Sequence, residues 1–228
     1  MRQLVLDLPV EARFGADDFL VSPSNEAAYS RVERWPDWPS PLLHLRGPAG
    51  SGKSHLASIW AERAQAVSLA AASVTDEVVA ALTDPPALLV EDLDRGPLAE
   101  GALFHLVNIA RERGLPFLFT SAEAVDRCGI RTADLLSRLR LAPTVEIDPP
   151  DDALLRAVLV KLFVDRQLVV DTSVVEFIAT RIERSLARAA EVVAALDREA
   201  LSRGRRITRP IAGALISADE PAHDSLEP

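Results

Sequence analysis

The sequence feature that most constrains the fold is an eight-residue segment: Gly47-Pro48-Ala49-Gly50-Ser51-Gly52-Lys53-Ser54. It matches G-x-x-x-x-G-K-[ST] at every fixed position, the pattern of a phosphate-binding loop between a strand and a helix. Leu42–Leu45 reads as a buried strand before it, and Lys53–Ala64 as a helix after it. Small residues let backbone amides surround a phosphate, and the helix N-terminus adds partial positive charge. We therefore predict a nucleotide site in which Lys53 reaches the β- and γ-phosphates and Ser54 completes a Mg²⁺ shell. The alternative is a glycine-rich turn that binds nothing.

Apolar segments alternate with helical patterns up to Ile147, which is typical of a parallel sheet covered by helices on both faces. The predicted strands are 42–45, 66–70, 87–90, 115–120 and 144–147, and the predicted helices are 25–32, 53–64, 75–82, 98–113 and 132–139. After Asp148-Pro149-Pro150 the pattern is purely helical, with apolar faces within 154–162, 174–182 and 186–196.

The predicted fold class is therefore α/β, a nucleotide-binding domain with a parallel sheet flanked by helices, followed by a small all-α domain. We place the α/β domain at residues 13–148 and the helical domain at 149–217. A flexible tail at 1–12 precedes them, and an acidic segment at 218–228 is expected to be disordered.

Two adjacent carboxylates, Glu91 and Asp92, end the apolar strand that precedes them. In a nucleotide-hydrolysing site, one such residue orients Mg²⁺ and the next polarises the attacking water. The usual order is Asp followed by Glu or Asp, whereas here Glu91 takes the metal side and Asp92 the position of the base. We expect nucleotide binding to survive this order but hydrolysis to be slow. Solvated strand-end carboxylates are the alternative.

Composition limits the partners, the cellular compartment and the metal sites that we expect for this protein. The net charge of −9 argues against a broad electrostatic contact with nucleic acid. No apolar run approaches the roughly 18 residues of a membrane span, and no secretion signal is visible. The single Cys128 fits a reducing compartment, and the scattered histidines have no zinc-ligand spacing. We expect a cytoplasmic protein without a membrane segment or a zinc site.

Several segments resemble the AAA+ ATPases, specifically the group of the replication initiator DnaA and its shorter relative Hda. The segment 18–28 is similar to the opening motif, in which Asn25 corresponds to an Asn near the adenine. Gly52–Leu56, with His55, resembles the GKTHL form of the phosphate loop, and 117–121 resembles the sensor-1 strand. The segments 136–139 and 146–150 are similar to the arginine-finger segment and to the hinge before the lid. The resemblance extends over residues 18–216, nearly the whole chain.

The resemblance implies roles for particular residues toward ADP or ATP with Mg²⁺. Thr120 (or Ser121 beside it) would lie near the γ-phosphate, and Arg188 stands where the family has its sensor-2 arginine. Arg138 would act as an arginine finger on a nucleotide held by a neighbouring subunit. A guanidinium is always charged and suits phosphate oxygens, but exposed arginines on helices are also common. Solvated surface arginines are therefore the alternative for both.

Near the N-terminus, Gln3, Leu4, Leu6 and Leu8 resemble the short peptide by which Hda-type proteins bind the DNA polymerase sliding clamp. Such a peptide docks leucine side chains into an apolar groove. An edge strand with alternating leucines is the other interpretation. About a dozen residues follow Ile216, too few for a helix-turn-helix domain, so we expect no sequence-specific DNA binding.

The resemblance predicts a negative regulator of replication initiation. It would bind the sliding clamp and stimulate, in trans, the hydrolysis of ATP by ATP-bound DnaA, with weak or absent hydrolysis of its own. An adaptor ATPase of the helicase-loader or transposition-helper type is the alternative, and a plain nucleotide-dependent interaction module is a third hypothesis. The sequence leaves open whether ADP or ATP is the working ligand and whether the chain forms a homodimer.

Overall fold

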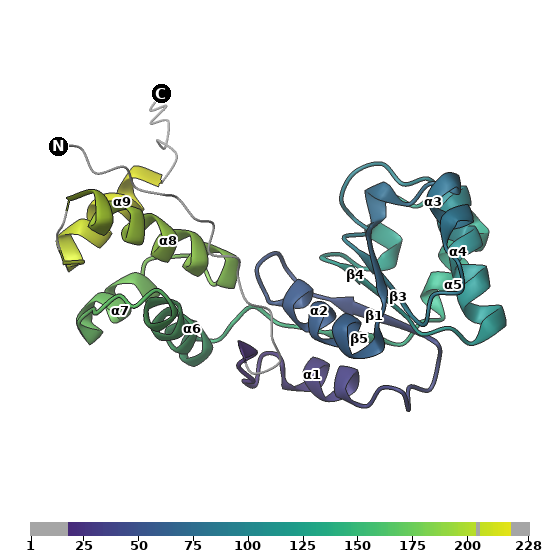
Figure 1. Cartoon of the computed structure of the whole chain (residues 1–228), viewed down its shortest axis with the longest axis horizontal. Coiled ribbons are helices and arrows are strands. Elements are labelled where there is room, and N and C mark those ends of the chain that lie inside the picture. The colour runs from purple at the N-terminus through teal and green to yellow at the C-terminus, as the bar shows by residue number, and fades with distance from the viewer. Residues whose placement is uncertain (1–17, 204–205, 220–228) are drawn as a thin grey trace, which may run out of the picture. The chain divides into compact units, whose positions relative to one another are not determined.

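The computed structural model describes residues 18–203 and 206–219, and Figure 1 shows them as helices and strands. They divide into two compact units, whose boundary in the sequence lies between Pro149 and Pro150. The predicted clamp-binding residues Gln3, Leu4, Leu6 and Leu8 lie outside the described residues. Each unit is described by itself below.

The first unit contains a five-stranded parallel sheet with the strand order β2-β3-β4-β1-β5. Its strands are β1 (Leu42–Arg46), β2 (Val67–Ala70), β3 (Leu88–Glu91), β4 (Phe117–Ser121) and β5 (Thr144–Glu146). In the register of the central strands, Leu45 of β1 lies opposite Thr120 of β4 and Val145 of β5. All the strands therefore end at one edge of the sheet, where the candidate site residues follow them. This architecture confirms the predicted α/β fold class.

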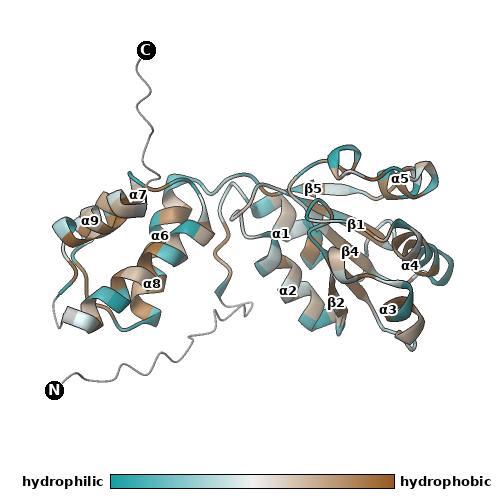
Figure 2. Cartoon of the chain, turned by 90° about the horizontal axis from the view of Figure 1, so that it is seen from above, coloured by the Kyte–Doolittle hydropathy of each residue, from teal (hydrophilic) through white to brown (hydrophobic). Residues whose placement is uncertain are grey.

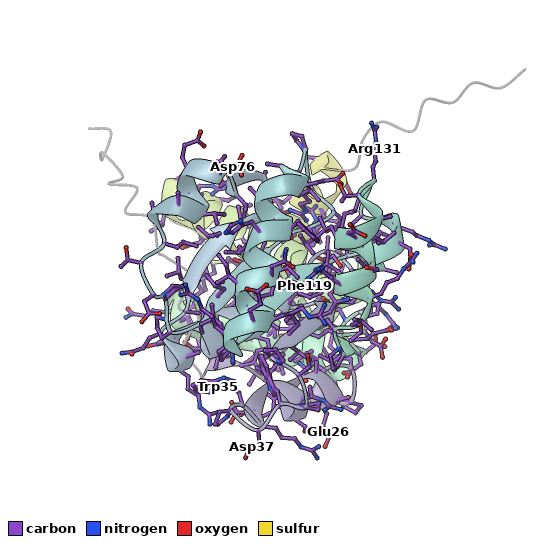
Figure 3. All side chains as sticks on the ribbon, turned by 90° about the vertical axis from the view of Figure 1, so that its right-hand side faces the viewer. Glu26, Trp35, Asp37, Asp76, Phe119 and Arg131 are labelled. Atoms are coloured by element: carbon purple, nitrogen blue, oxygen red, sulfur yellow. The ribbon has the colours of Figure 1, made fainter. Side chains whose placement is uncertain are left out.

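Helices cover both faces of this sheet, because alternate residues of each buried strand point to opposite sides. One face packs α1 (Glu26–Glu33) and α2 (Lys53–Ala64) around Trp60, while the other packs α3 (Asp76–Ala81), α4 (Glu100–Arg113) and α5 (Ala133–Arg140). Figure 2 shows the strands between these two groups of helices. In Figure 3, Phe119 lies in the middle of the unit, and Arg131 projects from its surface just before α5.

Most predicted bounds of the first unit differ from the structure by one residue or less, and two predicted starts differ by two residues. The strand predicted from Leu115 begins at Phe117, because Leu115 still belongs to the end of α4: its amide donates to the carbonyl of Ala110. Gly114, with φ +65°, makes the left-handed turn that ends the helix. The helix predicted from Leu98 begins at Glu100.

The second unit consists of helices α6 (Asp152–Asp165), α7 (Thr172–Ala179), α8 (Leu186–Arg203) and α9 (Arg209–Asp219). Aliphatic residues and Phe163 from all four form one core. Only three apolar faces were predicted here, and residues 218 and 219 were expected in the acidic tail, whereas α9 continues to Asp219. Ala212 and Ile216, four residues apart, are buried on its inner face, and Pro210 suits a first helical turn. Within the described part of the chain, no helix has the length and apolarity that a membrane crossing requires.

Candidate functional site

The phosphate-loop segment connects the end of β1 to the start of α2 and packs tightly against the sheet edge. A Cβ atom on Gly47 would overlap the carbonyl oxygen of Ile147, just beyond β5, and would lie 2.9 Å from Oγ of Ser51. Gly52, the residue before α2, has φ +100°, a left-handed conformation that favours glycine. Both glycines are therefore required by the loop's own shape, which brings its backbone amides to the N-terminus of α2.

The N-terminus of α2 is chemically suited to an anion. Gly52 has no side chain with which to cap the helix, and the first turn contains no acidic residue. Lys53, only 7% exposed, donates from Nζ to the carbonyl oxygens of Gly47 (2.6 Å) and Pro48 (2.8 Å). Burial lowers the pKa of Lys53, although the nearby carboxylates of Asp92 and Asp94 oppose this shift. The ammonium group thus lies against the loop, beside amides that carry partial positive charge.

Oγ of Ser51 in the loop and Oε1 of Glu91 at the end of β3 are both buried without a hydrogen-bond partner among the described residues. Buried polar groups in proteins are normally paired, so such atoms are expected to meet a ligand or water. Ser54 is exposed in the first turn of α2. Ser51, Ser54 and Glu91 together fit a phosphate with its Mg²⁺, since Mg²⁺ uses few protein ligands besides phosphate oxygens and waters. Within residues 18–203 and 206–219, no cluster of three or more His, Cys, Asp or Glu side chains forms a metal site of its own.

The candidate base Asp92 is held in an unusual backbone conformation. Its φ is +59°, and its amide donates to Oγ1 of Thr120 at 3.0 Å, while the amide of Leu93 donates to the Thr120 carbonyl at 2.9 Å. Thr120, predicted as the sensor residue, is fully buried and therefore fastens the acidic segment after β3 to β4. The Asp92 carboxylate lies 3.7 Å from the guanidinium of Arg95.

A third carboxylate at this edge, Asp94, was not singled out from the sequence. Its Oδ2 accepts a hydrogen bond from the amide of Ala122 at 2.9 Å, which links the segments after β3 and β4. Its Oδ1 is buried without a hydrogen-bond partner in the described part of the chain. The alternation after β3 could have signalled it, because Asp92 and Asp94 are separated by the buried Leu93.

His44 forms a buried polar layer on the other face of the same edge. Its Nε2 lies 2.7 Å from Oγ of Ser121, and its Nδ1 lies 3.2 Å from Oγ1 of Thr144. The Ser121 hydroxyl donates to the carbonyl oxygen of Glu123, so Nε2 of His44 is the donor to Ser121 and Nδ1 is the acceptor. Burial, with Arg46 nearby, lowers the pKa of His44 to about 4. The ring is therefore neutral near pH 7 and joins β1, β4 and β5.

A cavity of about 750 Å³ opens beside the first half of the phosphate loop. It borders Gly47, Pro48 and Ala49, but its other walls come from segments 122–127 and 146–148 together with Arg46, and they contain four carboxylates and two arginines. Both arginines are already paired, Arg46 with Glu146 and Arg127 with Glu123. A third wall carboxylate, Asp126, is paired with Arg140, and since both arginines of the wall are already compensated, neither is available to a phosphate. We therefore place the anion site at the N-terminus of α2 instead.

Two residues predicted to contact the nucleotide, Asn25 near the adenine and His55 in the phosphate-loop motif, have structural contacts of their own. Asn25 is buried, accepts from the Ser22 amide at 2.8 Å and donates to the Leu20 carbonyl at 2.9 Å. Its side chain therefore shapes the segment before α1. His55 lies edge-on to Phe19, with ring centroids 5.3 Å apart.

Arg138 lies in the last turn of α5, half-buried against α4. Its Nη1 donates to Oδ1 of Asn108, and its guanidinium carbon lies 4.8 Å from the ring centre of Phe104. The following arginine on the same helix, Arg140, is instead paired with the carboxylate of Asp126. The two arginines of α5 thus have different chemical partners.

Arg188 belongs to the second unit, in the first turn of α8. Its amide donates to Oγ of Ser185, which caps the helix at 3.2 Å, and its guanidinium lies 3.3 Å from Glu191. The side chain is 22% exposed.

Comparison with known proteins agrees with this fold. Residues 152–215 match the family described as Hda, lid domain. By sequence alone, no curated protein matches the chain. Among solved structures, domain III of the replication initiation protein DnaA from Thermotoga maritima is similar with a TM-score of 0.78 and 17% identity, covering 94% of this chain and all of that one. AMPPCP-bound DnaA from Aquifex aeolicus gives 0.68 and 18%, over 84% of this chain and 67% of that one. A variant of RuvB from Thermotoga maritima gives 0.68 and 18%, over 90% of this chain and 72% of that one.

The matches confirm the resemblance to AAA+ proteins of the DnaA and Hda group that the sequence segments predicted. The first unit carries the phosphate-loop segment on its parallel sheet, and the matched family covers most of the second unit. The chain thus has a fold similar to those of DnaA and RuvB, and its residues 152–215 match the Hda lid-domain family.

Proposed function

We propose that this chain is a nucleotide-binding regulator that stimulates hydrolysis of the ATP bound to DnaA. The observation that carries the proposal is the match of residues 152–215 to the Hda lid domain, in a chain that also contains the phosphate-loop pattern at residues 47–54. The proposal has three parts, which concern the nucleotide, Arg138 and the N-terminal segment.

For the nucleotide, the loop shape and the α2 N-terminus support binding of ADP or ATP with Mg²⁺. Lys53 would exchange its loop carbonyl partners for phosphate oxygens, and Ser54 and Glu91 would face the Mg²⁺. When bound, Mg²⁺ would screen the phosphate charges. In the similar DnaA of Aquifex aeolicus, the bound molecule is AMPPCP.

The chain's own hydrolysis is expected to be slow. The candidate base Asp92 already interacts with Arg95, and Glu91, not Asp, occupies the metal-side position. An attacking water would therefore be less strongly polarised than by a carboxylate without a cationic neighbour. Slow hydrolysis of its own nucleotide is compatible with a protein that acts on the nucleotide of a partner.

For the action in trans, Arg138 would stabilise the negative charge that develops on the phosphoryl oxygens of ATP held by DnaA. Arginine fingers of this kind accelerate phosphoryl transfer by about 10³- to 10⁵-fold. Arg188, in the lid, would contact the chain's own nucleotide and couple nucleotide state to the lid. Gln3, Leu4, Leu6 and Leu8 would bind the sliding clamp as an extended peptide, which would bring the regulator to clamp-loaded DNA.

The test measures hydrolysis of ATP by DnaA on clamp-loaded DNA with wild type, Arg138→Ala and Arg140→Ala. Arg140 is the matched control, since its substitution removes the same charge from the same helix turn. We expect Arg138→Ala to lose stimulation and Arg140→Ala to keep most of it. Equal stimulation by Arg138→Ala and wild type would remove the arginine finger from the proposal, and equal loss in both variants would reduce it to a general charge effect.

The clamp part is tested separately. A pull-down with the sliding clamp compares wild type with the double variant Gln3→Ala/Leu4→Ala, and with Asp7→Ala as the control in the same segment. Loss of capture in the double variant alone would support the clamp-binding role. Unchanged capture would reject it and leave the helicase-loader type of adaptor as the better hypothesis.

A further inference from the structure

We propose that Phe104 and Asn108 of α4 position Arg138 for its action on the partner's nucleotide, holding the guanidinium in place while leaving its charge intact. The inference rests on the proposed function, which assigns Arg138 its role in trans. It adds two positioning residues, which would contact neither the chain's own nucleotide nor the nucleotide of the partner.

The contacts come from one face of α4. Phe104 and Asn108 are four residues apart and are therefore neighbours on the helix surface. The Arg138 guanidinium lies over the Phe104 ring at 4.8 Å, within the range of a cation–π contact, and donates to the Asn108 amide oxygen. One contact restrains the plane of the guanidinium and the other restrains one of its donors, while its remaining N–H groups can bind phosphate oxygens.

The helix that carries Arg138 is also fixed on α4. The side chain of Glu100 accepts hydrogen bonds from the amides of Arg131 (3.0 Å) and Thr132 (2.7 Å), just before α5 begins. Leu135 and Leu139, on the inner side of α5, are fully buried in the core that α4 shares. Backbone and side chain of Arg138 are thus placed by the same neighbouring helix.

The chemical nature of the partners separates Arg138 from Arg140. Arg140 is paired with Asp126, and this pairing lowers the pKa of the Asp126 carboxyl. Arg138 is held by an aromatic ring and a neutral amide, and within the described residues no carboxylate lies at ion-pair distance from it. A residue that stabilises developing negative charge needs this combination, because a carboxylate partner would cancel part of its charge.

Ordering the side chain beforehand matters for the rate. A long arginine side chain loses rotamer entropy when it is fixed, and a group that is already oriented does not bear this cost during the reaction. We therefore expect Asn108→Ala and Phe104→Leu each to lower the maximal rate of stimulated hydrolysis by about tenfold, with the half-saturating concentration of the chain unchanged.

The experiment uses the full chain with DnaA-ATP on clamp-loaded DNA, and it measures maximal rate and half-saturating concentration. Phe104→Tyr keeps an aromatic face and should retain most of the wild-type rate, whereas Phe104→Leu should not. Asn108→Asp should hold Arg138 but neutralise it, and so should be as slow as Asn108→Ala. In parallel, the NMR order parameter of the Arg138 Nε–Hε group should fall in Asn108→Ala and Phe104→Leu and stay high in Asn108→Asp.

The outcomes distinguish a failure of the proposed arginine finger from a failure of its positioning by α4. If Arg138→Ala stimulates like wild type, the proposed finger and its positioning both fail. If Arg138→Ala is inactive while Asn108→Ala and Phe104→Leu keep the wild-type maximal rate, the finger stands and the positioning role is overturned. A higher rate in both α4 variants would show that the contacts restrain the finger, which also overturns the proposal. Should Phe104→Leu fail to fold, the Asn108 variants decide alone.

Discussion

Lowering the pH from 7 to 5 should destabilise the first unit through His44, the buried histidine of β1. Its ring stacks on Phe119, with centroids 4.6 Å apart, and its two nitrogens face the hydroxyls of Ser121 and Thr144. Arg46 further disfavours the charged ring, while Asp94 and Glu146 oppose that effect without cancelling it. Protonation therefore puts an ion into a site arranged for a neutral ring.

The size of the effect follows from the pKa difference. The pKa of His44 falls from its ordinary value of 6.5 to about 4 in the folded protein. Between these values the unfolded chain binds a proton that the folded chain does not. The stabilisation is therefore fully present above pH 6.5 and is lost as the pH falls toward 4. Since one pH unit corresponds to about 1.4 kcal/mol, the difference between pH 7 and pH 5 is about 2 kcal/mol in the free energy of unfolding.

The measurement is urea unfolding at pH 7, 6 and 5, followed by tryptophan fluorescence. All three tryptophans belong to the first unit, so the signal reports on the domain that contains His44. Carboxylates titrate as well, and the variant His44→Gln serves to subtract their contribution. Wild type should lose about 2 kcal/mol more than His44→Gln between pH 7 and 5. Parallel curves for the two proteins would refute the assignment of this pH dependence to His44.

Three further predictions concern the phosphate loop and its neighbours. Lys53→Ala should weaken binding of Mg-ADP and Mg-ATP by about 10- to 100-fold, the size of one lost charged hydrogen bond, in calorimetry; unchanged heats would reject the site. Gly47→Ala should lower the unfolding free energy by about 1–3 kcal/mol, because the added Cβ would overlap the carbonyl oxygen of Ile147. Gly101→Ala, with nothing within 4 Å of its Cβ, is the control that should be neutral or stabilising, and equal effects would contradict the clash. Thr120→Val should cost about 1–3 kcal/mol by leaving the Asp92 amide without its acceptor, whereas Thr120→Ser should be tolerated in the same urea assay.

The parts of the fold that could be predicted are those whose signal lies within a few consecutive residues. The helix predicted at Lys53–Ala64 has these bounds in the structure, since the loop pattern marks its beginning. Asp151 and Ser185 stand just before α6 and α8 and accept hydrogen bonds from first-turn amides, so these two helix starts are also marked by a local polar residue. Helix α9 was missed because its apolar segment 211–216 is short and interrupted by Gly213, and because its last turn enters an acidic segment. There the packing of Ile216 on the second unit's core outweighs the local composition.

The candidate site was harder to predict where it depends on contacts between residues that are far apart in the sequence. His44 faces Thr144 because their strands are adjacent in the sheet, a hundred residues apart in the sequence. Asp94 likewise accepts a hydrogen bond from the Ala122 amide because β3 and β4 are adjacent in the sheet, which brings the segments that follow them together. Periodicity predicts that the strands exist, but the strand order and register that make these contacts depend on the whole sheet.

The two arginines of α5 show what kind of information separates a candidate functional residue from a surface residue. In the phosphate loop the chemistry comes largely from backbone amides, so the spacing of glycines is enough to predict it. In the role proposed for Arg138, the chemistry would come from a side chain whose charge must stay uncompensated, and this depends on neighbours supplied by another helix. Arg140 has the same residue type, helix and turn, yet Asp126 compensates its charge. The neutral partners Phe104 and Asn108 are therefore the structural evidence that favours Arg138 over Arg140, and no spacing rule in the sequence provides it.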